Sequence, residues 1–174
     1  MRVYAVIDTN VIVSALLARN PQSATVKVLE AFWQGKIVPL VNDEIIGEYD
    51  EVLRRPKFRF PEELVAAVVA GIKQVAVSAE RVKTRQAFPD PKDAVFYEVA
   101  LSKEEAYLIT GNIKHFPHTP IVVTPAEMLD ILSSREDCLV LEKVDTKEST
   151  NEYCITKESV KASPLQTTSS SVSR

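Results

Sequence analysis

Residues 3–10 read VYAVIDTN, and this stretch decides the fold. Its first five residues are apolar without interruption, which predicts a strand buried on both faces of a parallel sheet. Asp8 stands where that strand ends, and a second apolar run from Val11 to Ala18 predicts a helix after it. A strand, an acid and a helix in this order place a carboxylate at the carboxyl edge of a sheet, where α/β proteins bind ligands. The function therefore depends on which other polar side chains reach the same edge.

Strands and helices alternate along the chain as far as about residue 132. Asp90 is expected to be the N-cap of one helix, with Pro91 as its first helical residue. The alternation predicts an α/β protein, a three-layer α/β/α fold with a central, mostly parallel sheet. After the first strand and helix, helices are predicted at 22–34, 43–55, 62–74, 90–102 and 125–132, and strands at 37–41, 75–77, 106–110 and 121–123.

The composition changes after about residue 135, so two parts are expected. Residues 1–135 form the domain, and residues 136–174 form a C-terminal extension that is partly disordered or loosely packed. Ser and Thr dominate the end of this tail, which therefore lacks core-forming residues. Within the tail, residues 138–141 are apolar enough to form a short strand. Tyr153 and Ile155 are large apolar side chains that could pack part of the tail against the domain.

The overall composition is that of an ordinary globular protein, with 45% hydrophobic and 26% charged residues among 174. Arg2 is followed by only five apolar residues, which do not make a secretory signal. No apolar run approaches the roughly 20 residues that span a bilayer. We therefore expect a cytoplasmic protein. Cys138 and Cys154 are too few and too far apart for a metal framework.

The net charge of −3 predicts no strong overall attraction to nucleic acid. A phosphate-binding surface must then be local. One candidate is the basic cluster Arg54, Arg55, Lys57 and Arg59. The alternative is that these residues form the solvated, charged end of a helix.

Three acids are candidates for one site at the sheet edge. Asp8 follows the first strand directly; it can cap the next helix, but Thr9 can fill that role and leave Asp8 free. Glu48 falls at the edge of the apolar stripe of the helix at 43–55, so it is either a rigidly held ligand or one more solvated helix acid. Asp93 lies in the first turn of the helix predicted from Asp90, where backbone N–H groups favour an ionised carboxylate.

Two polar residues lie at the end of the strand at 106–110, as Asp8 lies at the end of the first strand. Thr110 can donate its hydroxyl to an acid at the same edge of the sheet. Asn112 stands just beyond the strand, and Gly111 before it also makes this pair suitable for a turn.

Other kinds of site find little support. His115 and His118 have no acid or thiol at short spacing, which favours surface or structural histidines over a zinc site, with a phosphate contact as the alternative. Ser14 has no matching His and Asp, so serine hydrolysis is not supported.

Four short motifs occur in an order that resembles the PIN-domain ribonucleases. They are residues 6–11 (VIDTNV), 45–49 (IIGEY), 90–93 (DPKD) and 110–112 (TGN). Together with residues 55–58 (RPKF) and 112–117 (NIKHFP), they are similar to a bacterial subgroup described as toxins of toxin–antitoxin pairs. The resemblance covers roughly residues 1–132 and makes the domain at 1–135 a PIN-like nuclease domain.

The resemblance implies that Asp8, Glu48 and Asp93 are the catalytic acids and hold Mg²⁺ or Mn²⁺, with Glu48 as a ligand or a water orienter. The implied activity is that of an endoribonuclease. It cuts single-stranded RNA by in-line attack of metal-activated water and leaves 5′-phosphate and 3′-hydroxyl ends. Arg54, Arg55 and Lys57 would hold the RNA backbone.

The resemblance also assigns supporting residues and reveals one departure. Thr9, Asn10 and Thr110 would brace the acids. The family's fourth acid is usually Asp and falls here on Asn112, a neutral ligand that leaves the site one negative charge short. This implies weaker occupancy of a second metal position. Asp90 can supply the missing charge, in competition with its capping role.

Several alternatives remain open at this stage. A haloacid-dehalogenase-type phosphatase requires an acid where Asn10 stands, and a response-regulator receiver domain requires an N-terminal acid pair that this chain lacks. Asn112 makes a PIN-like RNA- or protein-binding module with weakened catalysis the stronger alternative. The expected partners are RNA, an antitoxin protein and a second copy of the chain through the apolar surface at 61–69. No membrane partner is expected.

Overall fold

A computed structural model describes residues 2–135 of the chain. The predictions for residues 136–174 lie outside the described residues. They concern the tail, its short strand, Tyr153, Ile155 and the two cysteines.

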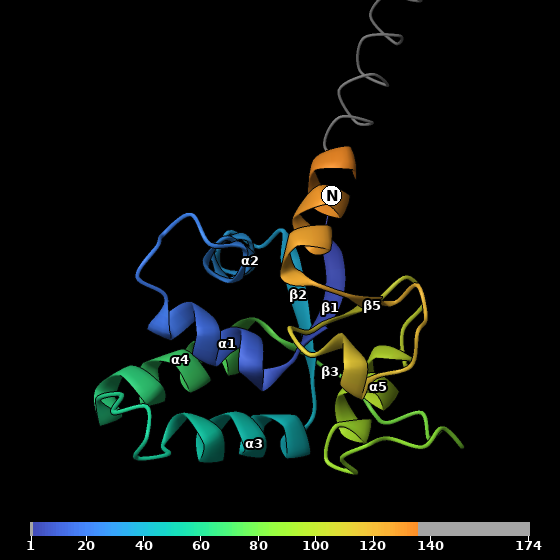
Figure 1. The fold of residues 1–174 in the computed structure, drawn as a ribbon, viewed down its shortest axis with the longest axis horizontal. Coiled ribbons are helices and arrows are strands. Elements are labelled where there is room, and N and C mark those ends of the chain that lie inside the picture. The colour runs from blue at the N-terminus through green and yellow to red at the C-terminus, as the bar shows by residue number, and fades with distance from the viewer. Residues whose placement is uncertain (1, 136–174) are drawn as a thin grey trace, which may run out of the picture. The chain divides into compact units, whose positions relative to one another are not determined.

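Within residues 2–135, five parallel strands form one sheet in the order β3-β2-β1-β4-β5 (Figure 1). The chain builds outward from β1 through β2 to β3, and then returns to place β4 and β5 on the other side of β1. The strand order therefore reverses at β1, and such a reversal is where α/β sheets bind ligands. The strands are β1 (Val3–Ile7), β2 (Ile37–Val41), β3 (Val77–Ser78), β4 (Tyr107–Ile109) and β5 (Val122–Val123).

Helices cover both faces of this sheet, which confirms the predicted three-layer α/β/α fold. In Figure 1, α1, α2 and α4 lie on one side of β1 and β2, and α5 lies on the other. α2 and α4 pack against β2, α1 contacts α2 and α3, and α5 packs on β1, β2 and β4. The helices are α1 (Thr9–Leu17), α2 (Ala24–Trp33), α3 (Asp43–Leu53), α4 (Glu62–Val75), α5 (Ala94–Ala100) and a last one at 125–135.

The core fixes the position of α3 relative to the end of β1. Tyr49 of α3 is buried and lies 6.4 Å from Phe96 of α5, measured between ring centroids. The Tyr49 hydroxyl donates a hydrogen bond to the backbone carbonyl of Ile7, the last residue of β1. Because Glu48 precedes Tyr49, this bond brings Glu48 to the end of the strand that Asp8 follows.

The helix predicted to start at Asp90 begins later than expected. α5 starts at Ala94, and the residues before it form a turn. Asp90 caps this turn: its Oδ1 accepts the Lys92 N–H at 2.9 Å, and its carbonyl oxygen accepts the Asp93 N–H at 3.0 Å. The prediction that Asp90 is the helix N-cap is therefore wrong, because its side chain is used within the turn. Asp93 takes the N-cap position without a side-chain bond to the helix.

Gly35 provides a test of how α2 ends. It follows the helix in a left-handed conformation with φ of 72°, the conformation in which a glycine commonly ends a helix. Replacing Gly35 by Ala should lower the free energy of unfolding by about 1 kcal/mol, because a Cβ is strained at this φ although the space around it is open.

The matched control is Gly47→Ala in α3. A Cβ at Gly47 also meets no atom within 4 Å, but the backbone there is helical. This variant should gain roughly 0.5–1 kcal/mol, the difference between Ala and Gly inside a helix. Urea denaturation measures both changes. A Gly35→Ala variant as stable as the parent protein would contradict this account of the turn.

Candidate functional site

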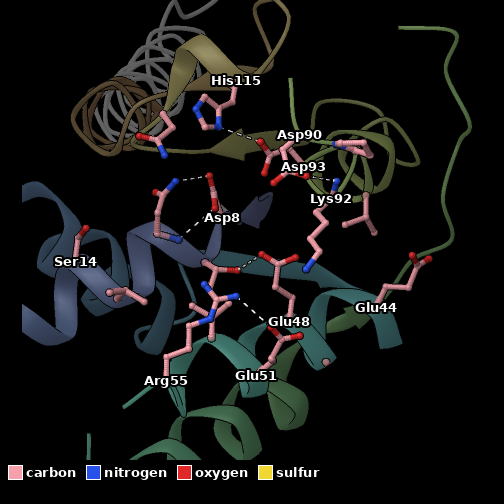
Figure 2. Close-up of a pocket in the computed structure, with 18 of the residues that line it drawn as sticks. Asp8, Ser14, Glu44, Glu48, Glu51, Arg55, Asp90, Lys92, Asp93 and His115 are labelled. Atoms are coloured by element: carbon pink, nitrogen blue, oxygen red, sulfur yellow. Dashed lines mark hydrogen bonds and ion pairs between the residues drawn. The ribbon is translucent and has the colours of Figure 1, made fainter. Parts of the chain in front are cut away.

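A cleft of about 810 Å³ lies beyond the carboxyl ends of β1 and β4. Its lining comes from the start of α1, from α3, from the turn before α5 and from the segment after β4. Figure 2 shows acidic side chains from three of these elements facing the same space. The polar lining includes Asp8, Glu48, Asp90, Asp93, Asn112 and His115.

Asp8 is the best anchored of the three predicted acids, with only 7% of its surface exposed. It is the N-cap of α1, because its Oδ1 accepts the Asn10 N–H at 3.2 Å. Its Oδ2 accepts the Thr110 hydroxyl at 2.6 Å. The side chain of Asn10 in turn accepts the Gly111 N–H at 3.1 Å. The segments that follow β1 and β4 are therefore tied together around one carboxylate.

The environment of Asp8 opposes its ionisation. Burial is the main cause that raises its pKa above the ordinary value, and the nearby charge of Asp93 adds to it. The hydrogen bonds from Thr110 and Asn10 act in the opposite direction but do not cancel the effect. A buried carboxylate held this way is stabilised by any cation that approaches its free lone pairs.

Glu48 lies on α3, close to the end of β1. Its Oε1 accepts the Thr9 hydroxyl at 3.3 Å. Partial burial raises the pKa of Glu48, and the negative charges of Asp8 and Asp93 raise it further, against the lowering effect of the Thr9 bond. Lys92 also lowers it, and its side chain reaches toward Glu48 in Figure 2.

Asp93 forms the third acidic position, directly before α5. Its side chain is 19% exposed, and Oδ2 lies 3.0 Å from Nδ1 of His115. Burial is the largest cause that raises the pKa of Asp93, and the charge of Asp90 adds to it, while the contact with His115 lowers it. Each of the three acids is thus affected by the charge of another carboxylate in the cleft.

Asn112 and Asp90 also line the cleft. Asn112 is exposed, and its backbone N–H donates to the Thr110 hydroxyl oxygen at 2.9 Å. The Thr110 hydroxyl therefore accepts a hydrogen bond from the Asn112 backbone N–H and donates one to the Asp8 carboxylate. Asp90 holds its turn with one carboxylate oxygen, as described above.

The basic cluster divides between two surfaces. Arg54 does not line the cleft; it is held by Asp50, with Nε 2.9 Å from Oδ2, and by Glu62. Arg55 and Lys57 do line the cleft, and Arg55 is paired with Glu51 at 3.1 Å.

Sequence reasoning missed the role of His115. It lies in the short 3-10 helix η1 (Ile113–His115), 22 residues beyond the acid that it contacts. No local spacing links the two residues, and only the pairing of β4 beside β1 brings η1 to the start of α5. The sequence carried no signal for this contact.

Arg81 was also missed, although a signal for it existed. Its Nε bonds Glu98 and its Nη1 bonds Glu44, both at 2.7 Å, and it lines the cleft. Glu98 is buried in an otherwise apolar helix, and a buried acid requires a partner. Burial alone would raise the pKa of Glu98, but the Thr84 N–H and the Arg81 guanidinium outweigh it and lower that pKa.

Comparison with protein families decides what kind of protein carries this cleft. A family model described as PIN domain matches residues 4–114, well over half of the chain. The chain belongs to the PIN domain family. PIN domains are generally nucleases and typically use divalent metal ions. The match includes the three acids and Asn112. A search of curated proteins finds no significant match.

The residues of this PIN domain fit a divalent ion by their chemistry. Asp8, Glu48 and Asp93 supply carboxylate oxygens, the ligands that Mg²⁺ and Mn²⁺ prefer. Their mutual charge effects favour a cation between them. In the arrangement described for residues 2–135, however, no group of three or more His, Cys, Asp or Glu side chains is close enough together to hold a metal ion. An ion bound here must therefore draw the carboxyl groups together.

Over the part of the chain that the structure describes, no helix of the PIN domain is both long and apolar enough to cross a bilayer.

The raised pKa of Glu48 predicts a pH-dependent gain in stability on its neutralisation. In metal-free protein, Glu48→Gln should raise the free energy of unfolding at neutral pH, because it removes a partly buried charge that two other acids repel. The increase in unfolding free energy is largest at pH values above the raised pKa of Glu48 in the folded protein. It vanishes as the pH falls below the ordinary value of 4.5, where the carboxyl group is protonated in both states.

The control is Glu51→Gln, one turn further along α3, where the side chain is 64% exposed. This change should alter the unfolding free energy by less than about 1 kcal/mol at neutral pH, because the pair of Glu51 with Arg55 is exposed to solvent. Chemical denaturation between neutral and acidic pH, in the presence of a chelator, measures both variants. A gain from Glu48→Gln that is equal at all pH values would refute the electrostatic explanation.

Proposed function

We propose that this PIN domain is a metal-dependent endoribonuclease that cuts single-stranded RNA with Mg²⁺ or Mn²⁺. The observation that carries the proposal is the placement of Asp8, Glu48 and Asp93 on three elements around one cleft, with the pKa of each raised. Such a cluster repels the phosphates of RNA by itself, so it makes chemical sense only with a cation.

Each acid has a distinct task in this proposal. Asp8 and Asp93 hold the ion, and Glu48 is a further ligand or orients water. When bound, a divalent ion lowers the pKa of a water molecule and stabilises negative charge on phosphoryl oxygens. Asp8 cannot rotate away from the cleft, because Thr110 and Asn10 fix both of its oxygens.

Neighbouring residues prepare the other acids and the substrate. Thr9 orients Glu48, and His115 orients Asp93. Asn112 adds a neutral oxygen to the cleft where an acid would strengthen a second ion, so the proposal is for one tightly held ion. Arg55 and Lys57 at the rim are placed to contact RNA phosphates.

The proposed biological role is that of a toxin in a toxin–antitoxin pair, acting in the cytoplasm. Its support is the resemblance of residues 55–58 and 112–117 to that subgroup. The expected partners are an antitoxin protein that blocks the cleft and a second copy of the chain.

Asp93→Asn should abolish divalent-dependent cleavage of single-stranded RNA while leaving the fold intact. The amide removes the charge that holds the ion but keeps the shape of the side chain. The measurement is cleavage of a 5′-labelled RNA with Mn²⁺, with Mg²⁺ and with a chelator. Electron paramagnetic resonance of free Mn²⁺ gives the affinity for the ion separately. The control is Asp130→Asn, an exposed acid on the last helix outside the cleft, which should retain full activity.

The outcomes separate the enzyme from its main alternative. Retained cleavage in Asp93→Asn would refute the assigned role of Asp93. A parent protein that binds RNA but never cleaves it with either ion would support a binding module, which the neutral Asn112 favours.

The toxin role has a test of its own. Induced expression of the parent chain in a bacterial host should arrest growth, and Asp93→Asn should not, because arrest requires RNA cleavage. Co-expression of a small open reading frame found directly upstream should restore growth. Unimpaired growth with active, soluble enzyme in the cell would rule the toxin role out.

A further inference from the structure

The connection between α3 and α4 alternates basic and aromatic residues, and the proposed function uses only the basic ones. Residues 54–60 read RRPKFRF. Proteins that bind single-stranded nucleic acid combine cations for the phosphates with aromatic rings on which bases stack. The question is whether an aromatic ring of this connection reaches the cleft.

Phe58 does reach it. Phe58 lines the cleft together with Arg55 and Lys57, whereas Phe60 does not. The Phe58 side chain is half-buried, so part of the ring is anchored and part is accessible. The backbone N–H of Phe58 donates to the Arg55 carbonyl at 3.0 Å, which closes a turn and fixes the origin of the side chain.

Two neighbours define the orientation of the Phe58 ring. The ring of Phe60 stacks on it, with 5.7 Å between centroids and planes inclined by 19°. The Lys57 ammonium lies over the Phe58 ring, 4.7 Å from its centroid. A ring face that attracts a cation in the free protein is a face that is not covered by the core.

We propose that Phe58 is a stacking platform for one base of a single-stranded RNA, beside the phosphate contacts of Arg55 and Lys57. This inference rests on the proposed nuclease function and extends it to a specific subsite. The Lys57 side chain is flexible, so its ammonium group can move from the Phe58 ring to an adjacent phosphate. A base can then stack on the ring face that the ammonium has left. Base faces are available in a single strand and hidden by stacking in a duplex, so the platform selects single strands.

A purely structural role for Phe58 makes a different prediction. Its ring also packs against the edge of the core, so truncation to Ala would disturb both packing and stacking. Phe58→Leu keeps an apolar side chain of similar size and removes the aromatic face. Phe58→Trp keeps and enlarges that face. Trp33→Leu is the matched control, because it removes an exposed aromatic ring on α2 that neither lines the cleft nor contacts Phe58.

The test is the affinity for a 5′-fluorescein oligouridylate, measured by anisotropy in a chelator at constant salt so that no cleavage occurs. Phe58→Leu should weaken binding roughly tenfold, the effect of losing one stacked base. Phe58→Trp should bind at least as tightly as the parent protein, and Trp33→Leu should bind within about twofold of it. A duplex of the same length should not distinguish Phe58→Leu from the parent.

Abasic substitutions in the oligonucleotide identify the base. Removing one uracil at a time should weaken binding of the parent protein roughly tenfold at a single position. For the oligonucleotide that lacks this uracil, Phe58→Leu should bind as tightly as the parent protein. The missing base and the missing ring remove the same stacking interaction, so their effects do not add. Equal affinity of Phe58→Leu and the parent, or weaker binding by a folded Phe58→Trp, would overturn the platform. These results leave the nuclease proposal intact, because that proposal stands or falls on cleavage with Mn²⁺ or Mg²⁺.

Discussion

The backbone carbonyl of Ile7 accepts the hydroxyl proton of Tyr49, and the next residue, Asp8, donates its N–H to Ile109 of β4 at 2.9 Å. These two bonds hold the end of β1 from α3 on one side and from β4 on the other. The rest of the cleft depends on them. They place Glu48 beside Asp8, and they bring Thr110 within hydrogen-bonding distance of the same carboxylate. A shift of either α3 or β4 would therefore disturb the end of β1.

The cleft stores unfavourable electrostatic energy in the absence of a cation. Burial and mutual repulsion raise the pKa of Asp8, Glu48 and Asp93 together. A protein selected for stability alone would not gather three carboxyl groups in this way. Their hydrogen bonds from Thr110, Thr9 and His115 fix the directions of the oxygens but do not neutralise the charge. A divalent ion would relieve this repulsion as it draws the carboxyl groups together.

Much of the fold is predictable from the sequence, because buried parallel strands require unbroken apolar runs and this chain has clear ones. Asp8 and Thr110 are found by the same argument, since each stands at the end of such a run. The start of α5 is not predictable in this way, because Asp90 can cap a turn or a helix with the same carboxylate. His115 is beyond sequence reasoning, because its contact with Asp93 exists only once the sheet has formed. Glu98 does carry a signal, and following it would have predicted a cationic partner such as Arg81.

The ion pairs of Arg81 have a mechanical consequence. Glu44 lies one turn before Glu48 on α3, and Glu98 lies on α5 beyond Asp93, so a single guanidinium joins the two helices that form opposite walls of the cleft. The fork of Arg81 is planar and rigid, and it reaches both acids at once. These ion pairs therefore oppose a separation of the two walls. A ligand that requires a wider cleft must break one of these ion pairs, and the pair with Glu44, the more exposed of the two acids, is the weaker one.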